Sequence, residues 1–138
     1  MKTLRISILL VTMVSAMVSF GQAKKPEWKE QKDYHTVMAA TFHPAEEGNF
    51  APLKAKSAEL AKKATAWSKS VYPAGYDKTA IAPLLKKLVA ESKLLDKKVK
   101  AGASNKDLNK LITALHDRFH AITEKCNAGD EHEGHDHK

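Results

Sequence analysis

Four stretches of the chain repeat apolar side chains every three, four or seven residues, the spacing of one face of an α-helix. The first stretch opens at Pro26 and is predicted to end at His43-Pro44, because the residue before a proline is pushed out of the helical region. Its apolar face holds Trp28, His35, Met38 and Phe42. The sequence has no alternating strand pattern, so it predicts an all-helical protein.

The second stretch follows Asn49, which can cap a helix, and tolerates Pro52 in its first turn. It is predicted to run to Pro73, where the segment 73–76 forms a turn. Its stripe is Leu53, Ser57, Leu60, Ala64, Trp67 and Val71.

The third stretch begins with Asp77 as its cap and ends at Gly102, and Pro83 is acceptable because it lies near the start. The inner face of this helix is predicted to be Ile81, Leu84, Leu88, Ser92, Leu95 and Val99.

The fourth stretch opens with Ser104 and Asp107, which resemble a capping box. It ends at residues 127–129, and its stripe is Leu108, Leu111, Leu115, Phe119, Ile122 and Cys126. Four amphipathic helices of similar length with short connections predict an up-down-up-down antiparallel four-helix bundle over residues 24–129.

Residues 1–23 have the pattern of a cleavable signal peptide. Lys2 and Arg5 give a basic start, an apolar run extends from Ile6 to Phe20, and small residues precede a cut after Ala23. The apolar run is too short to span a bilayer. We therefore expect a periplasmic or secreted protein that does not insert stably into a membrane after cleavage.

The formal charge of the chain is +7, and loss of Lys2 and Arg5 lowers it to about +5. Because the sequence has no basic run with interleaved aromatic residues, we expect solvated lysine faces and no nucleic-acid partner. The single cysteine, Cys126, cannot form an internal disulfide. It is interpreted as a small buried thiol or as a reactive thiol that joins two copies in a homodimer.

His116 and His120 are one helical turn apart, so their side chains can reach one metal ion. In an antiparallel bundle, the start of the first helix lies beside the end of the fourth, which places Met38 about level with His116 and His35 about level with His120. The predicted metal site is therefore His35, Met38, His116 and His120, with copper or zinc as the ion.

Two further sets of residues have metal-binding chemistry. His43 with Glu46 and Glu47 is a candidate secondary site, although a His-Pro pair is also a common way for a helix to end. In the segment 130–138, which is predicted to be disordered, His132, His135 and His137 alternate with acids and can chelate metal loosely. The sequence has no catalytic triad, no paired carboxylates in an apolar setting and no phosphate-binding glycine loop, so we expect no enzyme.

The helix count, the export signal, Met38 and the segment His116-Asp117-Arg118-Phe119 resemble the cytochrome b562 and cytochrome c′ group of periplasmic four-helix bundles. The resemblance covers the whole domain loosely and implies a haem flanked by Met38 and His116. Covalent attachment requires a Cys-x-x-Cys-His motif, whereas residues 112–115 here are Ile-Thr-Ala-Leu. The resemblance therefore implies at most a non-covalent haem b.

The sequence therefore favours an exported four-helix bundle that captures, buffers or delivers a transition metal through histidine and methionine ligands. The first alternative is an electron carrier with haem b. The second is a structural or adaptor bundle whose helical faces bind a partner protein.

Overall fold

The structure is a computed structural model that describes residues 24–128. It contains four helices: α1 (Lys29–Glu46), α2 (Ala51–Lys69), α3 (Lys78–Lys100) and α4 (Asn105–Asn127). The described residues contain no strand, which confirms the all-helical prediction. The predicted signal peptide and the histidine-rich tail lie outside the described residues.

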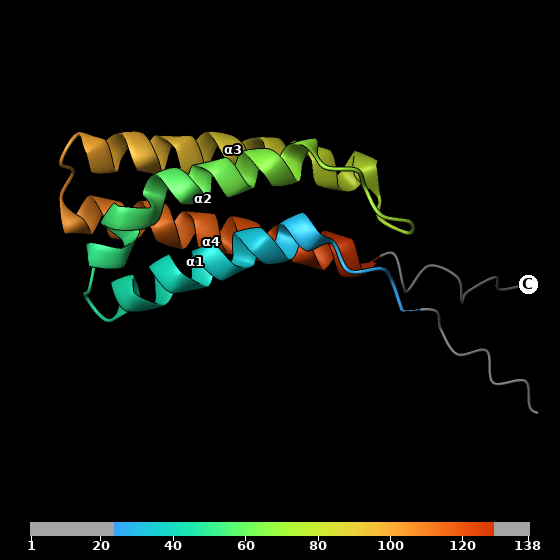
Figure 1. The fold of residues 1–138 in the computed structure, drawn as a ribbon, viewed down its shortest axis with the longest axis horizontal. Helices are drawn as coiled ribbons and strands as arrows, with labels where there is room; N and C mark the ends of the chain where they lie inside the picture. Colours follow the sequence, from blue (N-terminus) through green and yellow to red (C-terminus); the bar gives the residue numbers. More distant parts are fainter. Residues whose placement is uncertain (1–23, 129–138) are drawn as a thin grey trace, which may run out of the picture.

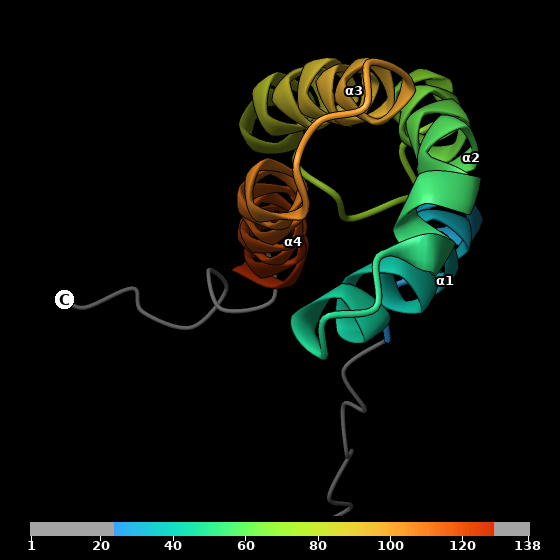
Figure 2. The same cartoon turned by 90° about the vertical axis from the view of Figure 1, so that its left-hand side faces the viewer.

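The helices follow one another around a ring and run alternately up and down (Figures 1 and 2). Each helix packs against its neighbours in the chain, and α4 returns beside α1 to complete a four-helix bundle. The contact between α1 and α4 is the least extensive of the four. This seam between the first and last helices carries the histidines discussed below.

The helix ends follow local side-chain chemistry. Asp77 caps α3, where its Oδ1 accepts hydrogen bonds from the backbone N–H of Thr79 at 2.8 Å and of Ala80 at 3.2 Å. The Oγ of Ser104 accepts from the Asp107 N–H at 3.2 Å and donates to the Asp107 carboxylate at 2.9 Å, as a paired cap at the start of α4. Gly102 has a φ of +72°, and this left-handed residue ends α3 as predicted.

The predicted end of the first helix at His43-Pro44 is wrong, because α1 continues through Pro44 to Glu46. The hydrogen bond that Pro44 cannot donate would have gone to the carbonyl of Ala40, an exposed residue whose carbonyl water can satisfy. The turn that follows the helix is formed instead at Gly48, which has a φ of +86°. There the Asn49 N–H donates to the Pro44 carbonyl at 2.8 Å and the Gly48 N–H donates to the Ala45 carbonyl at 3.0 Å.

The second helix is shorter than predicted, since α2 ends at Lys69 rather than reaching Pro73. Ser70 has extended backbone angles and leaves Val71 88% exposed, so Val71 is not part of the buried stripe. At the other end, Phe50 occupies the cap position, while the Asn49 side chain accepts from the Ala51 N–H at 3.2 Å.

The buried face of α1 differs from the predicted one, because His35 is exposed and Tyr34 is fully buried. The predicted register was counted from Trp28, which is buried but lies before the first residue of α1. Elsewhere Leu85 and Ile112 are fully buried where Leu84 and Leu111 had been expected, and Leu84, Leu111 and Val99 pack partly buried at the edge of the core.

A single core runs through the bundle. It contains aromatic side chains from α1, α2 and α4 in ring contact, with centroid separations of 5.7 Å for Tyr34–Trp67 and 6.0 Å for Trp67–Phe119. None of the described helices is long and apolar enough to cross a membrane.

Candidate metal centre

His116 and His120 face one another on α4. Their Nε2 atoms are 3.1 Å apart and their ring planes are nearly perpendicular, at 83°. The sequence spacing predicted a shared face, and the structure brings the two potential metal-binding nitrogens to within hydrogen-bond distance. The pair can therefore share one proton or accept one metal ion between the two rings.

The imidazole of His116 is held flat against a ring of α1. Its plane stacks on Phe42 at a centroid distance of 3.8 Å and an angle of 11°. Partial burial is the main cause that lowers the pKa of His116 below its ordinary value, and the nearby His120 lowers it further. Both effects favour the neutral imidazole, which is the form that binds metals.

The stacking of Phe42 on His116 also corrects the predicted register between the two helices. The sequence predicts Met38 level with His116, but the residue of α1 that lies opposite His116 is Phe42, one turn further along. Met38 itself is 0% exposed and belongs to the core. A methionine sulfur in that position is packed among apolar side chains, as is common for core methionines.

His43 of the candidate secondary site lies close to the primary pair. Its ring centroid is 6.4 Å from that of His116. The Nδ1 of His43 is 3.2 Å from the Glu46 carboxylate, and both side chains are exposed. When Nδ1 donates to Glu46, Nε2 is left as the free nitrogen, which is the arrangement that carboxylates impose on metal-binding histidines. The side chain of Glu47 is exposed at the end of α1.

His35 lies on the same seam, next to Phe119 rather than to the pair of histidines. The two rings are parallel, with a centroid distance of 4.9 Å and an angle of 3°. Phe119 also stacks on Tyr34, at a centroid distance of 6.0 Å. His35 thus covers the edge of the aromatic core, and this stacking accounts for its position without a metal.

The residues do not fit a haem between Met38 and His116. The two axial ligands of a haem iron must face the same pocket from opposite sides. Here Met38 is fully buried and His116 stacks on Phe42 at the seam. The interior is occupied by Tyr34, Trp67 and Phe119 in mutual ring contact. A haem in this space would have to displace those three rings.

Cys126 is 2% exposed near the end of α4. Burial raises the pKa of its thiol to about 11, so the thiol stays protonated at neutral pH. Both observations match the interpretation as a small buried thiol, and neither favours a disulfide between two copies.

The sequence predicts a primary and a secondary site, and the structure shows that His43 and His116 are neighbours. Residues 24–128 contain no group of three or more His, Cys, Asp or Glu side chains already arranged around one ion position. The arrangement is therefore a pair of facing imidazoles, with a third imidazole nearby. The signal for the third was present in the sequence, since Phe42 and His43 lie four and five residues after Met38.

Comparison with known proteins adds no relative: no family model, no curated protein and no solved structure matches the chain. The class defined by fold and site is an antiparallel four-helix bundle with a histidine cluster on the seam between its first and last helices.

Proposed function

We propose that this protein is an exported metal-binding bundle that captures, buffers or delivers one divalent transition-metal ion at the seam between α1 and α4. The ligands are His116, His120 and His43. The observation that carries the proposal is the 3.1 Å separation between the Nε2 atoms of His116 and His120.

This separation is close to what a metal ion requires. Two imidazole nitrogens bound to one tetrahedral ion at about 2.05 Å are about 3.3 Å apart. The two Nε2 atoms therefore need to separate by only a few tenths of an ångström to reach the spacing that one ion requires. Two histidines at positions i and i+4 of one helix are also held by the same rigid backbone, so little chain entropy is lost on binding.

His43 supplies the third ligand after a small movement. Two imidazoles on one tetrahedral ion have ring centroids about 5 Å apart, compared with 6.4 Å for His43 and His116. His43 is exposed and near the end of α1, so little packing opposes a rotation of its side chain toward the pair. Glu46 then fixes Nδ1 and leaves Nε2 for the metal.

The donor atoms select the ion. Met38 is the only methionine after the predicted signal peptide and is 0% exposed, so no thioether is available at the seam. Imidazole ligands without a thioether or thiolate favour Cu²⁺ and Zn²⁺ over Cu⁺, and Cu²⁺ binds most tightly of the common divalent ions. The proposed site is therefore for divalent copper or zinc rather than for reduced copper.

The experiment is a calorimetric titration of the metal-free protein with Cu²⁺ and, separately, with Zn²⁺. We expect one tight equivalent, at least 100-fold weaker binding after His116→Ala and His120→Ala together, and about tenfold weaker binding after His43→Ala. His35→Ala is the matched control, because it removes an exposed seam histidine that stacks on Phe119 instead of facing the pair. Unchanged affinity in the double variant contradicts the proposed site.

Two further measurements separate the remaining readings. Truncation after Gly129 removes His132, His135 and His137 and should eliminate only weak additional equivalents, because a chelating segment of the kind the sequence predicts loses chain entropy when it binds. A Soret band in untagged protein would instead support the haem b carrier. If the protein binds neither haem nor one tight metal equivalent, the remaining hypothesis is a structural or adaptor bundle that binds a partner protein.

A further inference from the structure

The charges of the bundle are divided unequally between its helices. α2 and α3 together contain twelve lysines and three acidic residues, whereas α1 and α4 together contain six basic and six acidic residues. All four described histidines are on α1 and α4. The positive charge of the molecule is therefore concentrated on the side opposite the histidine seam.

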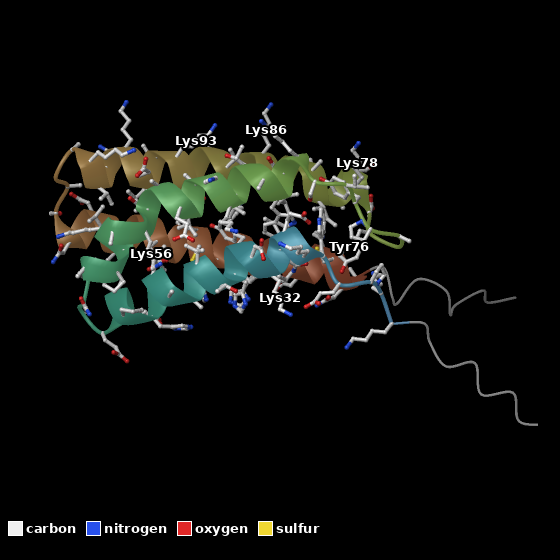
Figure 3. The ribbon with its side chains drawn as sticks, viewed as in Figure 1. Lys32, Lys56, Tyr76, Lys78, Lys86 and Lys93 are labelled. Atoms are coloured by element: carbon white, nitrogen blue, oxygen red, sulfur yellow. The ribbon has the colours of Figure 1, made fainter. Side chains whose placement is uncertain are left out.

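The outer face of α3 carries a group of five exposed lysines that belong to this positive charge. Lys86, Lys93 and Lys97 fall within about 40° of one another around the helix axis, and Lys87 and Lys98 follow on the adjacent row. All five are exposed. Figure 3 shows Lys86 and Lys93 extending from α3 away from the other helices. We call these five lysines the α3 lysine face.

The two acidic residues of α3 form their hydrogen bonds with residues outside this face, and Asp96 is also paired with Lys100 near the end of α3. Glu91 accepts two hydrogen bonds from Arg118 of α4, at 2.8 and 3.1 Å. Asp96 accepts a hydrogen bond from Ser57 of α2 at 2.9 Å, and its side chain is only 15% exposed. Among the described residues, no carboxylate forms an ion pair with any member of the α3 lysine face.

An apolar side chain lies within the same surface. Leu94 is 42% exposed, one of two large hydrophobic residues exposed in the described chain, and it occupies the row between Lys87 and Lys98. α3 has 23 residues and is about 34 Å long, so the face is a straight strip rather than a pocket. Such a strip matches an extended, flat anionic surface.

We propose that the α3 lysine face docks the protein on the anionic phospholipid headgroups of a membrane surface, with Leu94 inserted among them. Lysine side chains suit this partner, because a lipid surface offers many mobile phosphates and needs no fixed bidentate geometry. Nucleic-acid recognition favours arginine and stacking aromatic rings. The one arginine of the described bundle, Arg118, is paired with Glu91, and no aromatic residue lies on α3.

Docking through α3 leaves the α1–α4 seam facing away from the membrane (Figure 2). The lipid-binding face and the proposed metal site are on different helices and share no residue. Membrane docking and metal binding can therefore be tested separately, and the loss of one would not contradict the other.

The test is co-sedimentation with vesicles of phosphatidylcholine containing 30% phosphatidylglycerol, using the chain from Lys24 to Lys138, which contains every described helix. We expect binding at about 0.1 M salt that weakens as salt rises, and no binding to pure phosphatidylcholine. The triple variant Lys86→Gln, Lys93→Gln and Lys97→Gln should bind on the order of 100-fold more weakly, because each lysine near such a surface contributes about fivefold. Leu94→Ser should weaken binding severalfold.

The matched control is Lys106→Gln, Lys110→Gln and Lys125→Gln, which removes the same charge from exposed positions on α4. It should retain most of the vesicle binding. Equal loss in both triple variants would show an effect of net charge alone and overturn the proposal. Failure to bind anionic vesicles, or displacement from them by an equal charge of duplex DNA, would overturn it as well.

Discussion

The layer formed by α2 and α3 and the seam between α1 and α4 use the same helical pattern for different purposes. In the layer, apolar side chains, mostly leucines, fill the interior, and lysines cover the exterior, those of the α3 lysine face without an ion pair to a described carboxylate. At the seam, packing is less extensive and aromatic rings of one helix stack on imidazoles of the other, as Phe42 does on His116. The layer contributes buried apolar contacts and surface charge. The seam contributes imidazole side chains, which can act as metal ligands.

The largest expected effect belongs to the layer. Leu88 of α3 is 0% exposed, and its replacement by alanine should lower the free energy of unfolding by about 2–5 kcal/mol through lost burial and the cavity left behind. Chemical denaturation measures the change. Lys87→Ala, at the adjacent exposed position, is the control and should change stability by less than about 0.5 kcal/mol. If Leu88→Ala also weakens metal binding in its folded state, the layer and the seam are not independent.

The second effect belongs to the seam. An ion held by His43 of α1 and the pair on α4 joins the two helices that pack least extensively. At free metal 100-fold above its Kd, we expect the free energy of unfolding to rise by about 2.7 kcal/mol. Thermal unfolding measures this rise, and hydrogen exchange should show the added protection concentrated in α1 and α4. A rise of equal size in the His116→Ala, His120→Ala variant would show that metal binds elsewhere.

A smaller effect is expected where the two regions meet. Arg118 of α4 and Glu91 of α3 form a two-bond ion pair, and both side chains are close to one-third exposed. Because solvent screens the pair, its removal by Arg118→Ala should cost about 0.5–1 kcal/mol. A double-mutant cycle with Glu91→Gln isolates the pair from the packing of the arginine stem. A coupling energy near zero would mean that the pair orients Glu91 without stabilising the bundle.

The smallest effect concerns pH and the metal-free protein. The pKa of His116 is below its ordinary value of 6.5 in the folded state, so the unfolded chain binds more protons between those two values. The contribution of His116 to the free energy of unfolding is therefore fully present above pH 6.5 and is lost as pH falls through the pKa of His116 in the folded state. His116→Gln should flatten the stability–pH curve in this window. A curve unchanged by the substitution would indicate that His116 titrates normally.

Helix existence and type could be predicted from the sequence because each buried stripe repeats with helical spacing and three ends carry strong local signals. Asp77, Ser104 and Gly102 act through hydrogen bonds and backbone angles within a few residues, so their effect does not depend on the rest of the fold. Pro44 led to a wrong prediction of the end of α1, because the cost of a proline depends on whether the carbonyl that loses its hydrogen bond is exposed in the folded protein. Its missing hydrogen bond falls on the exposed Ala40, where the cost is small.

The candidate site was predicted in part, because the i, i+4 spacing of His116 and His120 is a property of any helix. The partner residues on α1 depend on the rotation and register of a second helix, which the sequence does not specify. An error of one residue exchanged buried Tyr34 for exposed His35, and an error of about one turn placed Met38 where Phe42 lies. The same uncertainty separated His43 from a pair that it adjoins in the structure.

The ammonium group of Lys25, before α1, donates a 2.8 Å hydrogen bond to the carbonyl of Cys126 in the last turn of α4. This contact holds the two ends of the bundle together, with a positive charge at the carbonyl end of a helix, where it is favourable. In topological terms, the four helices form a ring in which only α4 and α1 have no segment that connects them directly. A short linker from the end of α4 to Lys25 would allow the chain to be opened instead at Gly102, in the connection between α3 and α4, with all four helices retained in circularly permuted order.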